Sequence, residues 1–188
     1  MENISDKKKA IFESTLELIK DNGFHGTPMS LVAKKANVAA GTIYHYFESK
    51  DELICELYTY NKNLIIEIIA SALAAQISYE EKFYKIWCDL YCFYVQNTNV
   101  LVFFEQYLNS PYSANKCPGY FQGELRDFLQ QGINSGRIKN IKPEILIVFF
   151  LGSITSAAKL NMFGNIPLNE KDLKEIGEVL WKGIEISS

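Results

Sequence analysis

The sequence has few of the residues on which metal sites and most catalytic sites depend. Its only two histidines, His25 and His45, lie far along the chain from Cys88 and Cys92, the one closely spaced cysteine pair. A metal site would need more ligands near that pair. Beyond His45 the chain has no histidine, no dense carboxylate cluster and no nucleophile beside a base. We therefore expect no metal, no cofactor and no catalytic site, which argues against an enzyme.

Long apolar runs and a disulfide framework are also missing. The richest apolar stretch, residues 145–151, is about a third of the roughly 20 residues that a membrane-spanning helix needs. The first residues lead into an amphipathic pattern rather than a signal peptide. The four cysteines, at positions 55, 88, 92 and 117, read as buried thiols of a reducing compartment, with a thiol-sensing role as the alternative. We expect a cytoplasmic protein without a membrane segment.

A strong excess of positive charge is missing as well. The formal net charge is −3, which by itself does not indicate nucleic-acid binding. Residues 1–50 hold seven lysines against six acidic residues, so this part is slightly positive and the remainder is negative. Lys7, Lys8 and Lys9 at the start are either a solvated helix end or contacts to a DNA backbone. The distribution permits DNA binding through a local patch.

What the chain does have is helical periodicity and a large apolar content. Hydrophobic residues make up 48% of the chain and aromatic residues 13%, which is enough for one large or two small domains. Apolar residues recur at helical spacing, which predicts an all-α fold of about nine helices. The predicted helices cover residues 5–22, 28–36, 39–47, 50–75, 79–97, 100–109, 120–132, 142–163 and 170–186. Residues 110–119, with two prolines and a glycine, are predicted to form a loop.

The stretch 27–50 reads as two short helices joined by a tight turn. Thr27 can cap the first helix, and Asn37 suits the turn because Asn tolerates the left-handed conformation. In the second helix, Ile43 and Phe47 lie four residues apart and would face inward. Thr42, His45 and Tyr46 would then face outward, with Tyr44 on a flank. Such side chains can bind phosphates and read base edges.

These residues resemble the DNA-binding signature of the TetR (tetracycline-repressor-like) family. The resemblance rests on Val38-Ala-Ala-Gly-Thr-Ile-Tyr-His-Tyr-Phe, on Lys50 and Leu53 after it, and on Gly23-Phe24, Thr27, Val32-Ala33 and Ala36 before it. It covers about the first fifty-five residues. It implies a three-helix helix-turn-helix domain over 1–53 and a helical ligand-binding and dimerisation domain over 54–188, with the boundary inside a continuous helix.

The resemblance also implies a function. We expect a sequence-specific transcriptional regulator that acts as a homodimer on a near-palindromic operator in double-stranded DNA, most simply as a repressor that responds to a small apolar or aromatic effector. Two alternatives stay open at this point. One is a DNA-binding regulator without a small-molecule effector, and the other is an activator.

Specific residues follow from the motif. The resemblance makes Tyr44, His45 and Lys50 contacts to the DNA backbone. Thr42 and Tyr46 are the expected base contacts, and Gly41 allows close approach because it has no side chain. The expected DNA-binding residues are Thr27, Ala40, Gly41, Thr42, Tyr44, His45, Tyr46 and Lys50. Ala40 stands where the family commonly has a polar residue, so its methyl group could only touch a thymine methyl.

Aromatic side chains are unusually dense between residues 79 and 129. An aromatic stripe at helical spacing is most simply a core, but several of these side chains carry polar groups that need partners. Together with the family layout this suggests a pocket for a flat or apolar ligand. The candidate pocket residues are Phe83, Trp87, Tyr91, Tyr94, Phe103, Phe104, Tyr107, Phe121 and Phe128.

The last two predicted helices are the candidate dimer interface. Residues 142–163 are apolar and carry small side chains that allow close helix approach. In the family, the last two helices form a four-helix bundle with those of a second subunit. The candidate residues are Gly152, Ser153, Ser156, Ala157, Ile176, Leu180, Trp181 and Ile184. The alternative is that both helices are buried within one chain.

Overall fold

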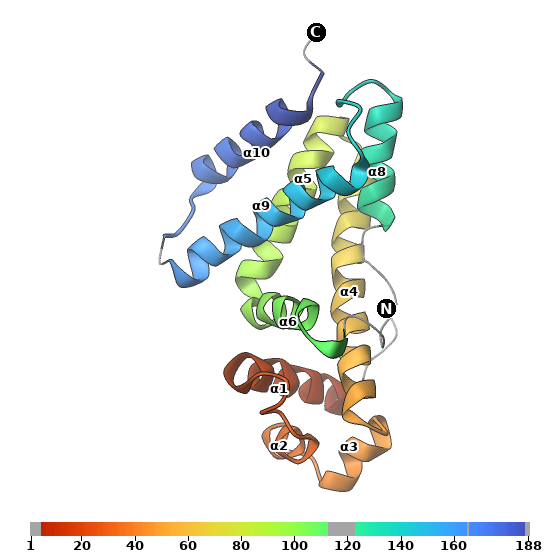
Figure 1. Cartoon of the computed structure of the whole chain (residues 1–188), viewed down its shortest axis with the longest axis vertical. Coiled ribbons are helices and arrows are strands. Elements are labelled where there is room, and N and C mark those ends of the chain that lie inside the picture. The colour runs from red at the N-terminus through yellow and green to blue at the C-terminus, as the bar shows by residue number, and fades with distance from the viewer. Residues whose placement is uncertain (1–4, 113–122, 165, 187–188) are drawn as a thin grey trace. The chain divides into compact units, whose positions relative to one another are not determined.

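The computed structural model describes residues 5–112, 123–164 and 166–186, and every extended element in these ranges is a helix (Figure 1). The helices, labelled as in Figure 1, are α1 (Asp6–Asn22), α2 (Met29–Lys35), α3 (Ala40–Tyr46), α4 (Lys50–Ala74), α5 (Tyr79–Gln96), α6 (Thr98–Leu108), α8 (Gly123–Asn134), α9 (Pro143–Phe163) and α10 (Glu170–Ile184). One isolated antiparallel bridge pairs Ile138 with Glu185. The prediction of an all-α fold is confirmed.

The chain forms two compact units, which we describe separately. Unit 1 comprises residues 1–61 and 99–119, and unit 2 comprises residues 62–98 and 120–188. The predicted division at residue 53 also fell inside α4, but the structure divides this helix further along and adds α6 to the N-terminal unit. Sequence spacing alone does not reveal this, because α6 reaches unit 1 only through tertiary contacts.

Local signals explain most helix ends in unit 1. The Ser5 side chain accepts a hydrogen bond from the Lys8 backbone at the start of α1. Gly23 (φ +68°) ends this helix in the left-handed region, where a side chain would be strained, and Asn37 (φ +53°) adopts the same region in the turn after α2. These predictions are confirmed. The predicted cap by Thr27 is wrong: α2 begins at Met29, and the Thr27 hydroxyl donates instead to the carbonyl of Gly23 at 2.8 Å.

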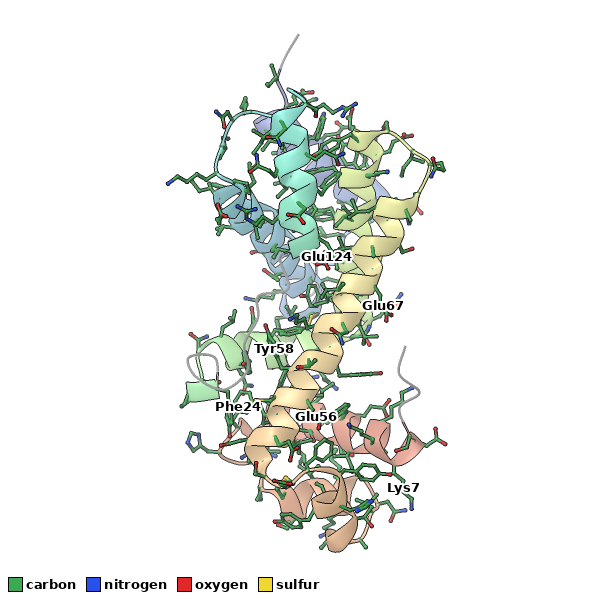
Figure 2. The ribbon with its side chains drawn as sticks, turned by 90° about the vertical axis from the view of Figure 1, so that its right-hand side faces the viewer. Lys7, Phe24, Glu56, Tyr58, Glu67 and Glu124 are labelled. Atoms are coloured by element: carbon green, nitrogen blue, oxygen red, sulfur yellow. The ribbon has the colours of Figure 1, made fainter. Side chains whose placement is uncertain are left out.

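Unit 1 has an apolar centre to which α6 contributes. The ring of Phe103 lies 5.9 Å from that of Phe24, which follows α1, and the ring of Tyr107 stacks on Tyr58 of α4 at 4.4 Å. Figure 2 labels Phe24 and Tyr58 within this unit. The Gln106 side chain donates to the carbonyl of Ile19 in α1 at 3.1 Å. Aromatic contacts and a hydrogen bond therefore hold α6 against α1 and α4.

Unit 2 is organised around α5, which packs against α9 and α10. The Phe83 ring lies 4.8 Å from Phe150 of α9 and 5.4 Å from Trp181 of α10. Gly177 of α10 is required by this packing, since a Cβ there would lie 2.7 Å from the ring of Tyr84. The cap of α10 by Asn169 is confirmed, with Asp172 completing a capping box.

One expectation needs correction. Cys55 is disulfide-bonded, so it is not the buried free thiol that was expected; of the other described cysteines, Cys88 is half-buried and Cys92 exposed. Spacing along the chain cannot show which cysteines meet in space. Among the described helices, α9 is long and apolar enough to cross a membrane by length and composition only, which is weak evidence because the core helix of a soluble protein passes the same test. Cys117, Phe121 and most of the predicted 110–119 loop lie outside the described residues.

Candidate nucleic-acid interface

The motif residues form a helix-turn-helix in which one side of α3 is buried and the other is open. Ile43 and Phe47 are fully buried, and the Phe47 ring lies 5.7 Å from that of Phe12 in α1. Val32 and Ala33 of α2 are buried in the same unit. The inward orientation predicted for Ile43 and Phe47 is confirmed. Because α3 makes only two turns, these two anchors fix which residues it exposes.

The open side of α3 carries four of the predicted DNA-binding residues. Ala40, Gly41 and His45 are exposed, and the Tyr44 side chain is 56% exposed despite its apolar ring. Thr42 is half-buried. A Cβ added to Gly41 would meet no heavy atom of the described chain within 4 Å. Nothing in the unit's own packing therefore requires glycine here, which is consistent with close approach to an external partner.

Three other predicted DNA-binding residues are engaged by the chain itself. Thr27 is 1% exposed and its hydroxyl donates to Gly23. The Tyr46 hydroxyl accepts a hydrogen bond from Ser5 at 3.1 Å. The Lys50 ammonium donates to the backbone carbonyl of Phe24, and burial lowers the pKa of this ammonium. The motif could not show these partners, and the role of the three residues in DNA binding stays a prediction.

The lysines of unit 1 divide into paired and open groups. Lys8 forms an ion pair with Glu56 of α4, and Lys35 forms one with Glu17 at 2.7 Å; this hydrogen-bonded contact raises the pKa of Lys35. Figure 2 labels Lys7, at the start of α1, and Glu56. Among the described lysines of unit 1, Lys7, Lys20 and Lys34 have no ion-pair partner. These three ammonium groups are therefore the ones available to a polyanion.

The candidate pocket residues are divided between the two units. Phe103, Phe104 and Tyr107 belong to unit 1, whereas Phe83, Trp87, Tyr91, Tyr94 and Phe128 belong to unit 2. All eight are buried, and they pack mainly on other rings: Trp87 stacks on Tyr91 at 5.6 Å, and Phe128 stacks on Tyr79 at 4.3 Å. Their polar groups have partners too, since the Trp87 indole donates to Ser153 and the Asn161 amide donates to the Tyr91 hydroxyl.

The two described cavities are lined mostly by other residues. A cavity of about 590 Å³ in unit 1 is lined by Phe24, His25, Lys50 and Gln106, among others. A cavity of about 710 Å³ in unit 2 lies between the start of α5 and α8, and Phe128 is the one candidate pocket residue that lines it. No group of three or more potential metal ligands occurs within the described ranges. The aromatic residues therefore form the cores of the units, and their role as a ligand pocket stays a prediction.

The predicted dimer residues are also divided. Ser153, Ala157 and Trp181 face the interior of unit 2, where Ser153 binds Trp87. Gly152 and Ser156 are exposed on the opposite side of α9. Ile176, Leu180 and Ile184 are half-buried.

The exposed side of α9 also carries large apolar residues that the sequence reasoning missed. Val148 is 70% exposed, Phe149 66% and Phe163 62%, and Val179 of α10 is 72% exposed. Val148 and Phe149 lie four and three residues before Gly152. This helical spacing from the small residues is the signal that could have found them.

Comparison with known proteins agrees with this geometry. The family described as "Bacterial regulatory proteins, tetR family" matches residues 11–57, and the family described as "Tetracyclin repressor-like, C-terminal domain" matches residues 78–185. Together these matches include the helix-turn-helix and most of unit 2.

Individual relatives extend the comparison over the whole chain. An uncharacterised HTH-type transcriptional regulator of Haemophilus influenzae is 25% identical over 96% of this chain and 97% of its own length. A fatty acid metabolism regulator protein of Bacillus subtilis is 26% identical over 71% of each chain. The crystal structure of the transcriptional regulator FadR from Bacillus subtilis in complex with stearoyl-CoA has the same fold, with a TM-score of 0.68, 21% identity and coverage of 93% of this chain and 95% of that one.

The family and these relatives are transcriptional regulators rather than enzymes. Their motif coincides with the exposed side of α3, and their C-terminal domain coincides with α5 to α10. This chain therefore belongs to the tetR family of bacterial regulatory proteins, as a transcriptional regulator with a helix-turn-helix DNA-binding domain.

Proposed function

We propose that the protein is a cytoplasmic, ligand-responsive repressor that binds a near-palindromic operator as a homodimer. The observation that carries the DNA-binding part is the exposed side of α3. Tyr44 is 56% exposed and His45 is exposed on a helix whose opposite side is anchored by fully buried Ile43 and Phe47. Large polar-tipped rings on a rigidly held short helix suit contact with phosphates and base edges.

A second copy of the chain is the proposed occupant of the exposed apolar face of α9. We define this dimer face by Val148, Phe149, Gly152, Ser156 and Phe163, which recur at spacings of one, three, four and seven residues and so share one side of the helix. Large exposed apolar side chains at such spacing mark an interaction surface. A two-fold dimer would present two copies of α3 to two half-sites, roughly 34 Å apart per helical turn of DNA.

The effector is proposed to be a small apolar molecule that binds in the C-terminal domain. A long-chain acyl-CoA is the first candidate because the FadR structure contains stearoyl-CoA and a fatty acid metabolism regulator is among the relatives. The aromatic interior of unit 2 would suit an acyl chain. To move a two-state balance from 1:99 to 99:1, the effector must bind one conformation about 5.5 kcal/mol more tightly than the other.

One experiment tests the DNA-binding proposal and supplies the probe for the effector. Purified protein is used to select duplexes from a random DNA library, which are then sequenced. We expect a near-palindromic motif that is lost with the Tyr44→Ala, His45→Ala double variant. If a folded wild-type protein enriches no duplex even at low salt, the DNA-binding proposal fails.

The selected duplex then allows the effector to be titrated. Stearoyl-CoA is added to the protein–DNA complex, with coenzyme A and stearate as separate controls. Saturable release by stearoyl-CoA alone supports an acyl-CoA effector. Tighter DNA binding on addition of stearoyl-CoA would contradict release by an effector. If none of the three compounds changes DNA binding, acyl-CoA is excluded as the effector, and the DNA-binding proposal is unaffected.

A further inference from the structure

The two ends of α1 are each hydrogen-bonded to the corner between α3 and α4. At its start, Ser5, the N-cap of α1, donates to the hydroxyl of Tyr46, the last residue of α3, at 3.1 Å. At its other end, the carbonyl of Phe24, next to the C-cap Gly23, accepts a hydrogen bond from Lys50, the first residue of α4. One helix therefore contacts both sides of the corner.

The separation of these two contacts matters for the orientation of α3. The seventeen residues of α1 span roughly 26 Å, so the two anchoring points are far apart. Tyr46 and Lys50 are only four residues apart in sequence, yet their side chains contact opposite ends of α1. Two anchors at opposite ends restrain rotation of the corner more strongly than either one alone.

A third polar contact lies between these anchors and supports the same arrangement. Lys8 of α1 pairs with Glu56 of α4, and its ammonium lies 5.4 Å from the centre of the Phe47 ring. Phe47 is the residue that directly follows α3 and is fully buried. Three polar contacts from the α1 region, those of Ser5, Lys8 and the Phe24 carbonyl, therefore reach the segment that sets the direction of the exposed side of α3.

We propose that Tyr46 and Lys50 are positioning residues, which fasten the α3–α4 corner to both ends of α1, and are not direct DNA contacts. The proposal rests on the proposed DNA-binding function and narrows it. Base and phosphate contact then falls to the residues with open side chains on α3, chiefly Tyr44 and His45. Charge neutralisation of the DNA backbone falls to lysines without an internal partner, such as Lys7.

The salt dependence of DNA binding separates a positioning lysine from a phosphate contact. Each lysine that neutralises a phosphate contributes about 0.9 to the slope of log K against log salt concentration. We would measure this slope on the selected duplex for the wild type, for Lys50→Met and for the matched control Lys7→Met. Methionine keeps most of the apolar stem and removes the ammonium in both variants.

The proposal expects a specific pattern. Lys50→Met weakens DNA binding about tenfold with an unchanged slope and lowers the urea midpoint of unfolding. Lys7→Met lowers the slope by about 0.9 and leaves the urea midpoint unchanged. A Lys50→Met protein with wild-type stability and a slope lower by about 0.9 would overturn the assignment of Lys50.

A double-mutant cycle tests Tyr46 in the same assay. Ser5→Ala and Tyr46→Phe each remove the same hydrogen bond. The double variant should therefore bind DNA with about the affinity of whichever single variant binds less tightly. Neither should change the preferred bases. If Tyr46→Phe alters the preference at one base pair while Ser5→Ala does not, Tyr46 reads DNA directly and its assignment here is wrong.

Failure of the DNA-binding proposal would be distinguishable from failure of this one. If the wild-type protein selects no duplex, the proposed function falls, but the urea midpoints still decide whether Lys50 holds the corner. Lys50→Met less stable than Lys7→Met supports the anchor. Equal stability of the two variants contradicts it.

Discussion

The two units each bury most of their described aromatic rings but expose rings of different chemistry. In unit 1, Tyr44 stands exposed on α3 although a large ring in water gains nothing from the fold. In unit 2, Phe83, Trp87 and Tyr91 are buried, and each packs on another ring. Phe149 and Phe163 of α9 are exposed too, but they lack the polar tip of Tyr44. On the proposed function, the exposed rings contact partners, DNA for Tyr44 and a second chain for Phe149, while the buried rings hold each unit together.

Trp87→Ala is expected to have the largest effect on stability and tests the unit 2 side of the comparison. Removal of a buried indole, together with its hydrogen bond to Ser153, should cost about 3–5 kcal/mol of unfolding free energy. Urea unfolding followed by circular dichroism measures this, and Trp87→Phe, which keeps a ring but not the N–H group, isolates the hydrogen bond. A wild-type urea midpoint together with a changed response to stearoyl-CoA would instead assign Trp87 to a ligand cavity.

Tyr44→Ala tests the unit 1 side. Because the Tyr44 ring is more than half exposed, its removal should leave the urea midpoint nearly unchanged. The free energy of operator binding should weaken by about 1–3 kcal/mol, which is roughly a 5- to 150-fold loss of affinity. Fluorescence anisotropy with the selected duplex gives the affinity. Loss of stability in proportion to the loss of affinity would mean that Tyr44 is a core residue after all.

Gly41→Ala should move stability and binding in opposite directions. A Cβ at position 41 meets no heavy atom of the described chain within 4 Å, and alanine favours a helix over glycine by about 1 kcal/mol. The variant should therefore unfold at a higher urea concentration but bind the operator more weakly, since the added methyl would meet DNA. Unchanged affinity would show that α3 does not approach DNA closely at this residue. Gly152→Ala, at an exposed glycine of α9 in unit 2, is the control for the helix effect alone.

The smallest expected effect concerns the start of α5. Ser78 hydrogen-bonds to the Glu81 carboxylate and holds its pKa below the ordinary value of 4.5. The larger contribution comes from the Ser78 hydroxyl and the smaller one from its backbone N–H. A lowered carboxyl pKa contributes stability above pH 4.5 that is lost as pH falls through the lowered pKa. Glu81→Gln should reduce the acid sensitivity of unfolding slightly, measured by urea midpoints over an acidic pH series. Glu80→Gln, one residue away, should not, and equal effects of the two would contradict the assigned cause.

The fold and the site were predictable from the sequence to different degrees. Helix ends set by Ser5, Gly23, Asn37 and Asn169 were predicted because caps and turns depend on a few neighbouring residues. The exposure of His45 followed from the four-residue spacing of Ile43 and Phe47. The same spacing put Tyr44 on a flank and Tyr46 outward, whereas Tyr44 is exposed and Tyr46 is half-buried. These are local relations within one or two helical turns.

What could not be predicted depends on partners that are distant in sequence. Lys50 bonds to a carbonyl twenty-six positions earlier, Tyr46 to a side chain forty-one positions earlier, and Trp87 to one sixty-six positions later. Ser153 is a small residue of the kind that suits a helix–helix interface, but the interface in which it lies is the one between α5 and α9 inside unit 2. A periodic pattern gives the side of a helix on which a residue lies and does not say which element covers that side.

The most direct test of the whole account is the number of chains bound to one selected duplex. Native mass spectrometry of the wild type and of the Phe149→Glu variant gives this number. The account predicts two chains on a full palindromic site for the wild type. For Phe149→Glu it predicts a folded single chain in solution with weak operator binding, because the charge lies on the dimer face while α3 is intact. One wild-type chain on a full site, or a Phe149→Glu variant that still dimerises and binds normally, would contradict it.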